Sequence, residues 1–297
     1  MQSAWRPWAA ALVSICLWAS AFVGIRAATR EFAPGALALG RLGIGTLLLG
    51  TLLLRRGTIR PTLRETRLLV LSGLLWFGVY NVALNTAEGT LDAGTAAMIT
   101  NLAPLMVLVL AWIFLRERPT AALIAGGLVA FAGIVVIGLS TTARSASAAG
   151  VLLCLLATTA AAAGLVAQKH ALARLQALQV TWTCCLVGAV CCAGYAPSLV
   201  HDVRGASIGS VAIVAYLGVF PTSVAFTCWA YALARLPANR LMTLVYLVPL
   251  IAITISWLLL GEVPPVMAVA GGVLCLSGVV IARRRPANSL ATARPPS

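Results

Sequence analysis

Long runs of apolar residues, separated by short charged or Pro- and Gly-containing segments, set the pattern of the chain. The runs are continuous and lack the two-residue alternation of strands, which favours helices over a barrel. A helix needs about 20 apolar residues to cross a bilayer, and the runs supply ten such helices. Their predicted ranges are 8–27, 34–54, 67–89, 93–115, 120–140, 149–169, 178–200, 208–234, 239–260 and 264–282.

The composition changes the class of protein that can be considered. Of 297 residues, 61% are apolar and 9% are charged, and the mean hydropathy is +0.99. So few charged residues cannot cover a core with a hydrated surface. We therefore expect an all-α, polytopic membrane protein.

The formal charge of +14 would suggest a nucleic-acid partner in a soluble protein, so the placement of the charges decides. If the N-terminus is cytoplasmic, 16 of the 21 Lys and Arg residues fall in cytoplasmic segments. The others are Arg26, Arg30, Arg144 and Arg204 on the opposite side, and Arg41 within the second helix. This positive-inside bias predicts that both termini are cytoplasmic, and it accounts for the charge without nucleic acid.

Two segments of 37 residues, from Asn101 to Ile137 and from Tyr246 to Ala282, are similar in sequence. At a constant displacement of 145 residues (249 − 104 = 145), 12 of the 37 aligned positions are identical. The matches include Pro104 with Pro249, Trp112 with Trp257, Glu117 with Glu262, Pro119 with Pro264, and Gly126, Gly127 and Gly133 with Gly271, Gly272 and Gly278. The chain therefore consists of two repeats.

Each repeat holds five predicted helices, and because five is odd the second repeat enters the membrane from the opposite side. We predict a first repeat over residues 8–140, a second, inverted repeat over 149–282 and a basic, disordered tail over 283–297. Rocking of one inverted half against the other opens a central cavity to alternate sides of the membrane. The arrangement therefore favours transport.

Several of these residues also carry a family resemblance. They are Trp18-Ala-Ser-Ala-Phe22, the prolines Pro104 and Pro249, the turns Leu-Arg-Glu117-Arg-Pro and Leu-Gly-Glu262-Val-Pro, and the Gly-Gly helices that follow. Together they resemble the two EamA domains of the drug/metabolite transporter superfamily. The resemblance implies ten helices around a cavity lined mainly by helices 1, 3, 4, 6, 8 and 9, in the bacterial inner membrane, and it permits a monomer. Such proteins export amino acids, other metabolites and drugs, and exporters of aromatic and other neutral amino acids are the most similar in general character.

The third predicted helix carries a polar stripe. Asn81, Asn85 and Glu88 are four and three residues apart, which places them on one helix face, and Tyr80 lies beside them. Polar side chains at membrane depth face protein or a wet cavity. The stripe therefore indicates either hydrogen bonds between helices or contacts to a solute or water.

Two prolines mark the fourth and ninth predicted helices. Asn101 and Tyr246 each stand three residues before a proline, Pro104 or Pro249. Because proline removes a helix hydrogen bond, it leaves a carbonyl one turn earlier without its donor. We expect kinks that also act as gating hinges, and we expect Asn101 and Tyr246 to contact solute, with Trp18 and Tyr80 next.

Charged residues near the helix ends have simpler interpretations. Arg26 and Lys169, at matching positions, are expected to reach the membrane surface as snorkelling anchors. Glu117 and Glu262 each precede by two residues a proline that begins the next helix, so their carboxylates are expected to cap those helices.

The sequence lacks the parts of an enzyme active site. His170 and His201, the two histidines, fall near loops, and no His-Glu-x-x-His motif is present. The eight cysteines lie inside predicted helices, without metal-ligand spacing, and are interpreted as packing residues. We therefore predict no enzyme, no metal and no cofactor. The expected partners are a small-molecule substrate and membrane lipid.

The acidic residues inform the mechanism, because only Glu88 of the seven falls within a predicted span. Proton coupling needs a titratable group inside the membrane. The sequence therefore favours facilitated uniport of small organic solutes, neutral or aromatic amino acids first, with alternating access and broad specificity. The alternatives are a proton-coupled drug or metabolite efflux pump that uses Glu88, and a membrane protein that does not transport.

Overall fold

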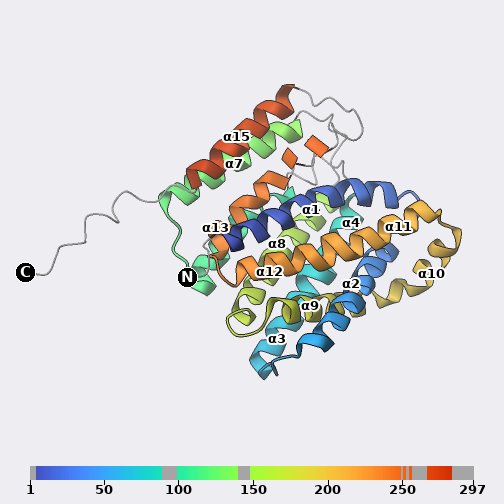
Figure 1. Ribbon diagram of the computed structural model, residues 1–297. Helices are drawn as coiled ribbons and strands as arrows, with labels where there is room; N and C mark the ends of the chain where they lie inside the picture. Colours follow the sequence, from blue (N-terminus) through green and yellow to red (C-terminus); the bar gives the residue numbers. More distant parts are fainter. Residues whose placement is uncertain are drawn as a thin grey trace, which may run out of the picture.

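The computed structural model describes residues 5–88, 99–139, 148–248, 250–251, 254–255 and 266–282. Within these residues the regular structure is helical throughout and contains no strand (Figure 1). The expected all-α class is therefore confirmed for the described part of the chain.

The helices of the first half follow the apolar runs. They are α1 (Arg6–Ala28), α2 (Pro34–Arg56), α3 (Leu63–Ser72), the π-helical η1 (Gly73–Val79), α4 (Tyr80–Glu88), α6 (Ala103–Leu115) and α7 (Ala121–Leu139). The elements α3, η1 and α4 follow one another without a break. This helix begins four residues earlier than predicted because Thr62 and Glu65 form a capping box that includes the basic segment before the apolar run.

The helices of the second half also follow the apolar runs. They are α8 (Ala148–Ala171), α9 (Ala177–Cys191), η2 (Ala193–Tyr195), α10 (Ala196–Gly205), α11 (Ile208–Leu217), the π-helical η3 (Gly218–Val224), α12 (Ala225–Leu233), α13 (Ala238–Met242), η4 (Thr243–Tyr246) and α15 (Val266–Ala282). The helix predicted over 178–200 is bent in the structure, where α9 and the segment after it meet at 55°. Gly194 and Pro197 lie at this bend, where glycine is flexible and proline favours the start of a new helix.

Several helices are suited to a bilayer by length and hydropathy. In the described part of the chain, four helices are long and apolar enough to cross a membrane: Pro34–Arg56, Leu63–Leu84, Ala148–Ala171 and Ile208–Leu233. The bent pair of α9 and α10 adds a fifth if it forms one span. Shorter apolar helices cover 103–115, 121–136 and 269–282. The described residues thus support a polytopic membrane protein with four or five spans of full length.

Equivalent positions in the two halves adopt the same local structure. The π-helical elements Gly73–Val79 and Gly218–Val224 are displaced by 145 residues (218 − 73 = 145). The hydroxyls that cap the preceding helices, Thr62 and Ser207, share this displacement, and each accepts from a backbone N–H three residues later at 3.3 Å. The two halves thus share a π-helical turn, a rare feature, at equivalent positions.

The packing between the halves is reciprocal. Helix α1 packs on α11 and α12, whereas α8, its counterpart, packs on α3 and α4. Likewise α2 packs on η3, and α9 packs on η1. At these contacts Gly218 lies against Ile44 of α2, and Gly73 lies against Val187 of α9. Each of these contacts between a helix of one half and a helix of the other half is therefore repeated by the two counterpart helices.

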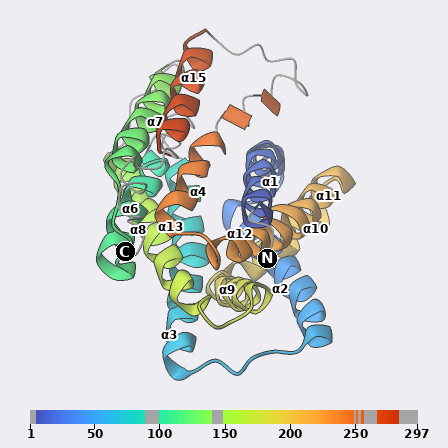
Figure 2. The same cartoon turned by 60° about the vertical axis from the view of Figure 1, so that its left-hand side comes forward.

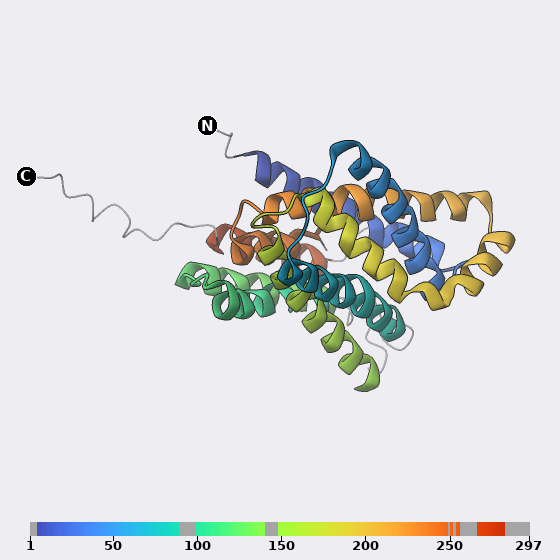
Figure 3. The same ribbon diagram turned by 90° about the horizontal axis from the view of Figure 1, so that it is seen from below.

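The helices α7 and α15 pair separately, at the opposite end of the molecule from α10 (Figures 1 and 3). Gly126 lies against the carbonyl of Gly278, and Gly133 lies against the carbonyl of Gly271. Since 126 + 145 = 271 and 133 + 145 = 278, each glycine meets the counterpart of the other. Such exchange of partners is the mark of an isologous, two-fold contact. Figure 2 shows the two helices side by side from a second direction.

Candidate functional site

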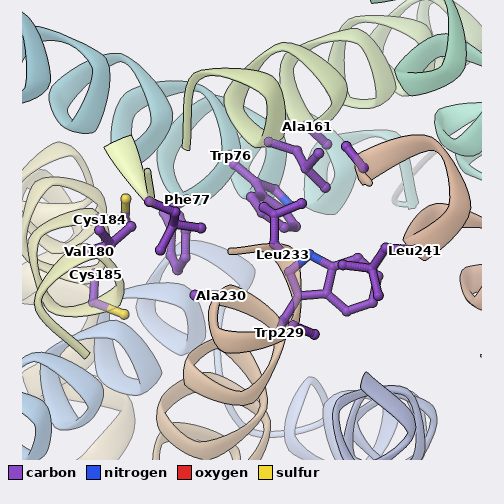
Figure 4. Packing of buried hydrophobic residues seen from close by; sticks show 14 of the residues in the cluster. Trp76, Phe77, Ala161, Val180, Cys184, Cys185, Trp229, Ala230, Leu233 and Leu241 are labelled. Atoms are coloured by element: carbon purple, nitrogen blue, oxygen red, sulfur yellow. The ribbon is translucent and has the colours of Figure 1, made fainter. Parts of the chain in front are cut away.

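Five large aromatic side chains gather where α1, η1 and α12 meet. This aromatic cluster consists of Trp18 from α1, Trp76 and Phe77 from η1, and Phe226 and Trp229 from α12. The ring centroid of Trp18 lies 4.9 Å from that of Trp229 and 5.1 Å from that of Phe226, within the range of favourable aromatic pairs. Figure 4 shows Trp76 and Phe77 facing the α12 side chains Ala230 and Leu233. Elements of both halves thus build the cluster.

A polar junction adjoins the aromatic cluster, and we define it as Trp18, Arg41, Tyr80 and Thr222. The indole Nε1 of Trp18 donates to the carbonyl of Pro221 at 3.3 Å. The Nε of Arg41 donates to the hydroxyl of Thr222 at 3.0 Å, and the Tyr80 phenol interacts electrostatically with the guanidinium. Both acceptors belong to η3, where the π-helical turn and Pro221 alter the regular hydrogen-bond ladder.

Buried hydroxyl groups brace α12 next to the cluster. Ser14 of α1 donates to the carbonyl of Ala225 at 2.8 Å, and Thr181 of α9 donates to the carbonyl of Phe226 at 3.3 Å. Both hydroxyl-bearing residues are fully buried. Because buried carbonyls need donors, these bonds hold the backbone that carries Phe226 and Trp229 in place.

The polar stripe of the third predicted helix is described only in part. Asn81 donates its amide to the carbonyl of Phe77 at 2.7 Å, a bond within its own helix. The side chains of Asn85 and Glu88 lie outside the described residues. Tyr80 is half-buried and reaches the polar junction. Of these residues, Tyr80 is thus the one that lies near Arg41.

The two proline-marked helices differ in what the structure describes. The chain leaves the helical path at Asn101 and Leu102, and Pro104 occupies the first turn of α6. Pro249 lies outside the described residues. Tyr246 ends η4 and packs with Ala130, Ile134, Cys275 and Val279 of α7 and α15. Asn101 is buried, and Tyr246 belongs to a different hydrophobic cluster from Trp18.

Two charged side chains hold the turn between α12 and α13, and we call this arrangement the end clamp. The Glu117 carboxylate accepts from the backbone N–H groups of Ala238 and Asn239 at 3.0 and 3.1 Å. The Lys169 ammonium donates to the carbonyls of Leu233 and Leu236, the latter at 2.6 Å. Each charge complements the helix end that it faces, since α13 begins and α12 ends there.

The end clamp corrects one sequence-based expectation. Glu117 does not cap the helix that follows it, because the hydroxyl of Thr120 accepts from Leu123 N–H at 3.2 Å there. Lys169 was expected to reach the membrane surface, and its ammonium donates to carbonyls at the end of α12. The side chain of Arg26 and all of Glu262 lie outside the described residues.

Charged side chains also form hydrogen bonds between segments of the first half and segments of the second half. Arg174 donates to Glu65 at 2.8 Å, and this carboxylate raises the pKa of Arg174 above its usual value. Elsewhere, Glu31 accepts from the Ser207 N–H at 2.6 Å, and this bond holds the pKa of Glu31 below its usual value. The loop before α2 is fixed as well, because Ala33 N–H donates to Asp202 at 2.8 Å.

A groove of about 480 Å³ between α2, α10 and α11 is lined by apolar residues, which suits a hydrocarbon chain better than a polar solute. Within the described ranges, no three His, Cys, Asp or Glu side chains are grouped so as to hold a metal ion.

Arg41 was missed as a site residue by the sequence analysis. The signal was present, because a single arginine interrupts the otherwise uncharged stretch 34–54. From sequence alone, Arg41 was placed only inside the second predicted helix. Its partner Thr222 lies 181 residues away and could not be inferred from spacing.

Comparison with known proteins gives consistent matches. A family profile described as the EamA-like transporter family matches residues 6–139 and again residues 148–284. The chain is 34% identical over 279 residues to the "Probable terminal-alkyne amino-acid exporter" of Streptantibioticus cattleyicolor, covering 93% of each chain. It is 30% identical over 265 residues to an uncharacterized transporter, YdfC, of Bacillus subtilis, covering 89% of this chain and 87% of that one.

A solved crystal structure shares the fold. It superposes with a TM-score of 0.77 at 21% identity and covers 92% of this chain and 95% of its own. At this identity the likeness concerns architecture alone.

Proposed function

The chain belongs to the EamA-like transporter family of membrane proteins, and from this premise we propose that it exports small organic solutes, amino acids first among them, by alternating access. The observation that carries the proposal is the reciprocal packing of the two halves around the aromatic cluster and the polar junction. A site built at the contact of two similar halves changes when one half moves against the other.

We assign the first repeat to residues 8–140 and the second to 149–282, with ten helices in total. The constant displacement of 145 residues, the two family matches and the exchanged contacts of Gly126 and Gly133 support this division. Five helices in each repeat make the second inverted. The arginine-rich segments then lie in the cytoplasm with both termini, and the membrane is the bacterial inner membrane.

The proposed movement uses Pro104 and Pro249 as hinges. The chain already departs from a helix just before Pro104, so changes in backbone angle there disrupt few hydrogen bonds. The close α7–α15 contact is suited to remain fixed because it is formed by backbone atoms. The end clamp, formed by flexible side chains, is suited to open and close.

For the substrate we propose a neutral or aromatic amino acid. The relative from S. cattleyicolor is described as a probable terminal-alkyne amino-acid exporter, and Trp18 and Phe226, the partly exposed rings of the aromatic cluster, offer apolar surface to a side chain. We propose Trp18, Tyr80, Asn81, Asn85, Asn101 and Tyr246 as the solute contacts. Transport is proposed to be uniport by a monomer, and proton coupling through Glu88 is the competing mechanism.

Uptake into proteoliposomes tests this function. We expect saturable uptake of tritiated L-phenylalanine without an imposed pH gradient, because the proposed path has no obligatory proton carrier. Glu88→Gln should then change the initial rate by less than about twofold, an effect under about 0.5 kcal/mol. Protein-free liposomes serve as the blank.

The alternatives give different results. Uptake that requires a pH gradient and is lost in folded Glu88→Gln would replace uniport by proton coupling. Uptake of drug-like cations with no uptake of amino acids would assign the site to drug export.

A further inference from the structure

The guanidinium of Arg41 is a partly buried charge for which the described residues show no structural need. Arg41 stands seven residues into α2 (41 − 34 = 7), about 10 Å along a helix axis from its first residue. Its sequence neighbours are apolar, and Leu42 is buried. A cation in such a position is costly unless it is paired, hydrated or used.

The described residues give this cation little compensation. Arginine has five N–H donors, and here its Nε is bonded to the hydroxyl of Thr222. The ion pair found in the described part of the chain lies elsewhere, between Arg174 and Glu65. The neutral hydroxyl of Thr222 and the phenol of Tyr80 do not balance a full positive charge, so the Nη groups of Arg41 are suited to bind an anion.

The other half shows that packing does not require the charge. The position equivalent to Arg41 is Cys184 (184 − 41 = 143), a neutral and fully buried residue. The backbone contacts at the two positions are alike, since a Cβ at Gly218 would lie 3.1 Å from the Arg41 carbonyl, and one at Gly73 would lie 3.1 Å from the Cys184 carbonyl. Helix α9 therefore makes the same close contact without a guanidinium.

The neighbours of Arg41 fit one class of ligand. Trp18 bonds to Pro221, the residue next to Thr222, and its ring belongs to the aromatic cluster. Arg41 and the rings thus approach consecutive residues of η3. A solute with a carboxylate and an apolar or aromatic group could place the first on Arg41 and the second against the rings.

We propose that Arg41 binds the carboxylate of the transported solute and so selects amino acids over their neutral or cationic analogues. The inference rests on the proposed transport function. A guanidinium and a carboxylate form paired, charge-assisted hydrogen bonds that an amide cannot match. Because the charge lies in only one of the two equivalent positions, the solute is held in one orientation.

The test compares L-phenylalanine with L-phenylalaninamide in proteoliposomes. We expect Arg41→Gln to raise the KM for phenylalanine about 30-fold and to change the KM for the amide by less than about twofold. Arg41→Lys, which keeps the charge and loses the planar fork, should raise the KM for phenylalanine about fivefold. Arg204→Gln, an exposed arginine in α10, is the matched control and should change neither value.

The outcomes separate this inference from the proposed function. Equal losses for both compounds in Arg41→Gln, or an unchanged preference for phenylalanine, would overturn the role of Arg41. If the wild type carries neither compound, the amino-acid function fails, and thermal stabilisation of the purified protein by benzoate then tests the anion site. Stabilisation of the wild type but not of folded Arg41→Gln supports the site, and no stabilisation of the wild type refutes it.

Discussion

Replacing Gly126 by alanine is expected to destabilise the protein by about 3 kcal/mol, at the upper end of what one added methyl group costs in a packed core. A Cβ at this position would lie 2.4 Å from the carbonyl oxygen of Gly278 and 2.4 Å from the backbone nitrogen of Ala282. These atoms belong to the backbone of α15 and cannot turn aside as a side chain can. The helices α7 and α15 must therefore separate.

The neighbouring glycine supplies the matched control. In Gly127→Ala the Cβ would lie 3.2 Å from the Cδ2 atom of Leu105, the flexible end of a side chain. Both substitutions replace a helical glycine by alanine, so they gain the same helix propensity. Unfolding midpoints of the purified proteins in one detergent measure the difference. Equal midpoints for the two variants would mean that the close α7–α15 contact does not form.

Much of the fold could be predicted because apolar runs and repeated residues are local signals. The spacing of 145 residues located equivalent helices, and it also relates the two π-helical elements at Gly73 and Gly218. The π-helical turns themselves were not foreseen, because an α-helix and a π-helix have the same apolar composition in lipid. The bend before α10 was missed since Gly194 and Pro197 stand inside a run that is otherwise apolar.

The site was less predictable because its contacts join distant parts of the chain. Trp18 and Tyr80 were selected for their chemistry; Trp18 bonds to Pro221 of η3, and Tyr80 lies near Arg41. Tyr246 was selected by its proline spacing, and in the structure it packs with residues of α7 and α15. The partner of Glu117 lies 121 residues away, so no helix-capping rule could identify it. Local patterns predict which residues are polar at membrane depth but not where they point.

The second large effect is expected at the end clamp, where Glu117→Ala should lower the free energy of local unfolding at the start of α13 by about 3 kcal/mol. The substitution removes the acceptor of two backbone N–H groups, those of Ala238 and Asn239, and the negative charge near Lys169. Hydrogen exchange in the peptide over residues 234–242 should therefore become about 100-fold faster. Glu117→Gln keeps an acceptor but not the charge, so its exchange rate should lie between those of the wild type and Glu117→Ala.

The neighbouring Arg118 provides the comparison that makes this result specific. Its side chain is exposed, so Arg118→Ala alters the same loop without touching the turn between α12 and α13. Exchange that accelerates equally in Arg118→Ala and Glu117→Ala would assign the effect to a loosened loop and contradict the clamp. Exchange that accelerates only in Glu117→Ala would show that one carboxylate holds the helix end. In the proposed cycle this bond must break whenever that end of the cavity opens, so the same variant should also change the rate of solute exchange.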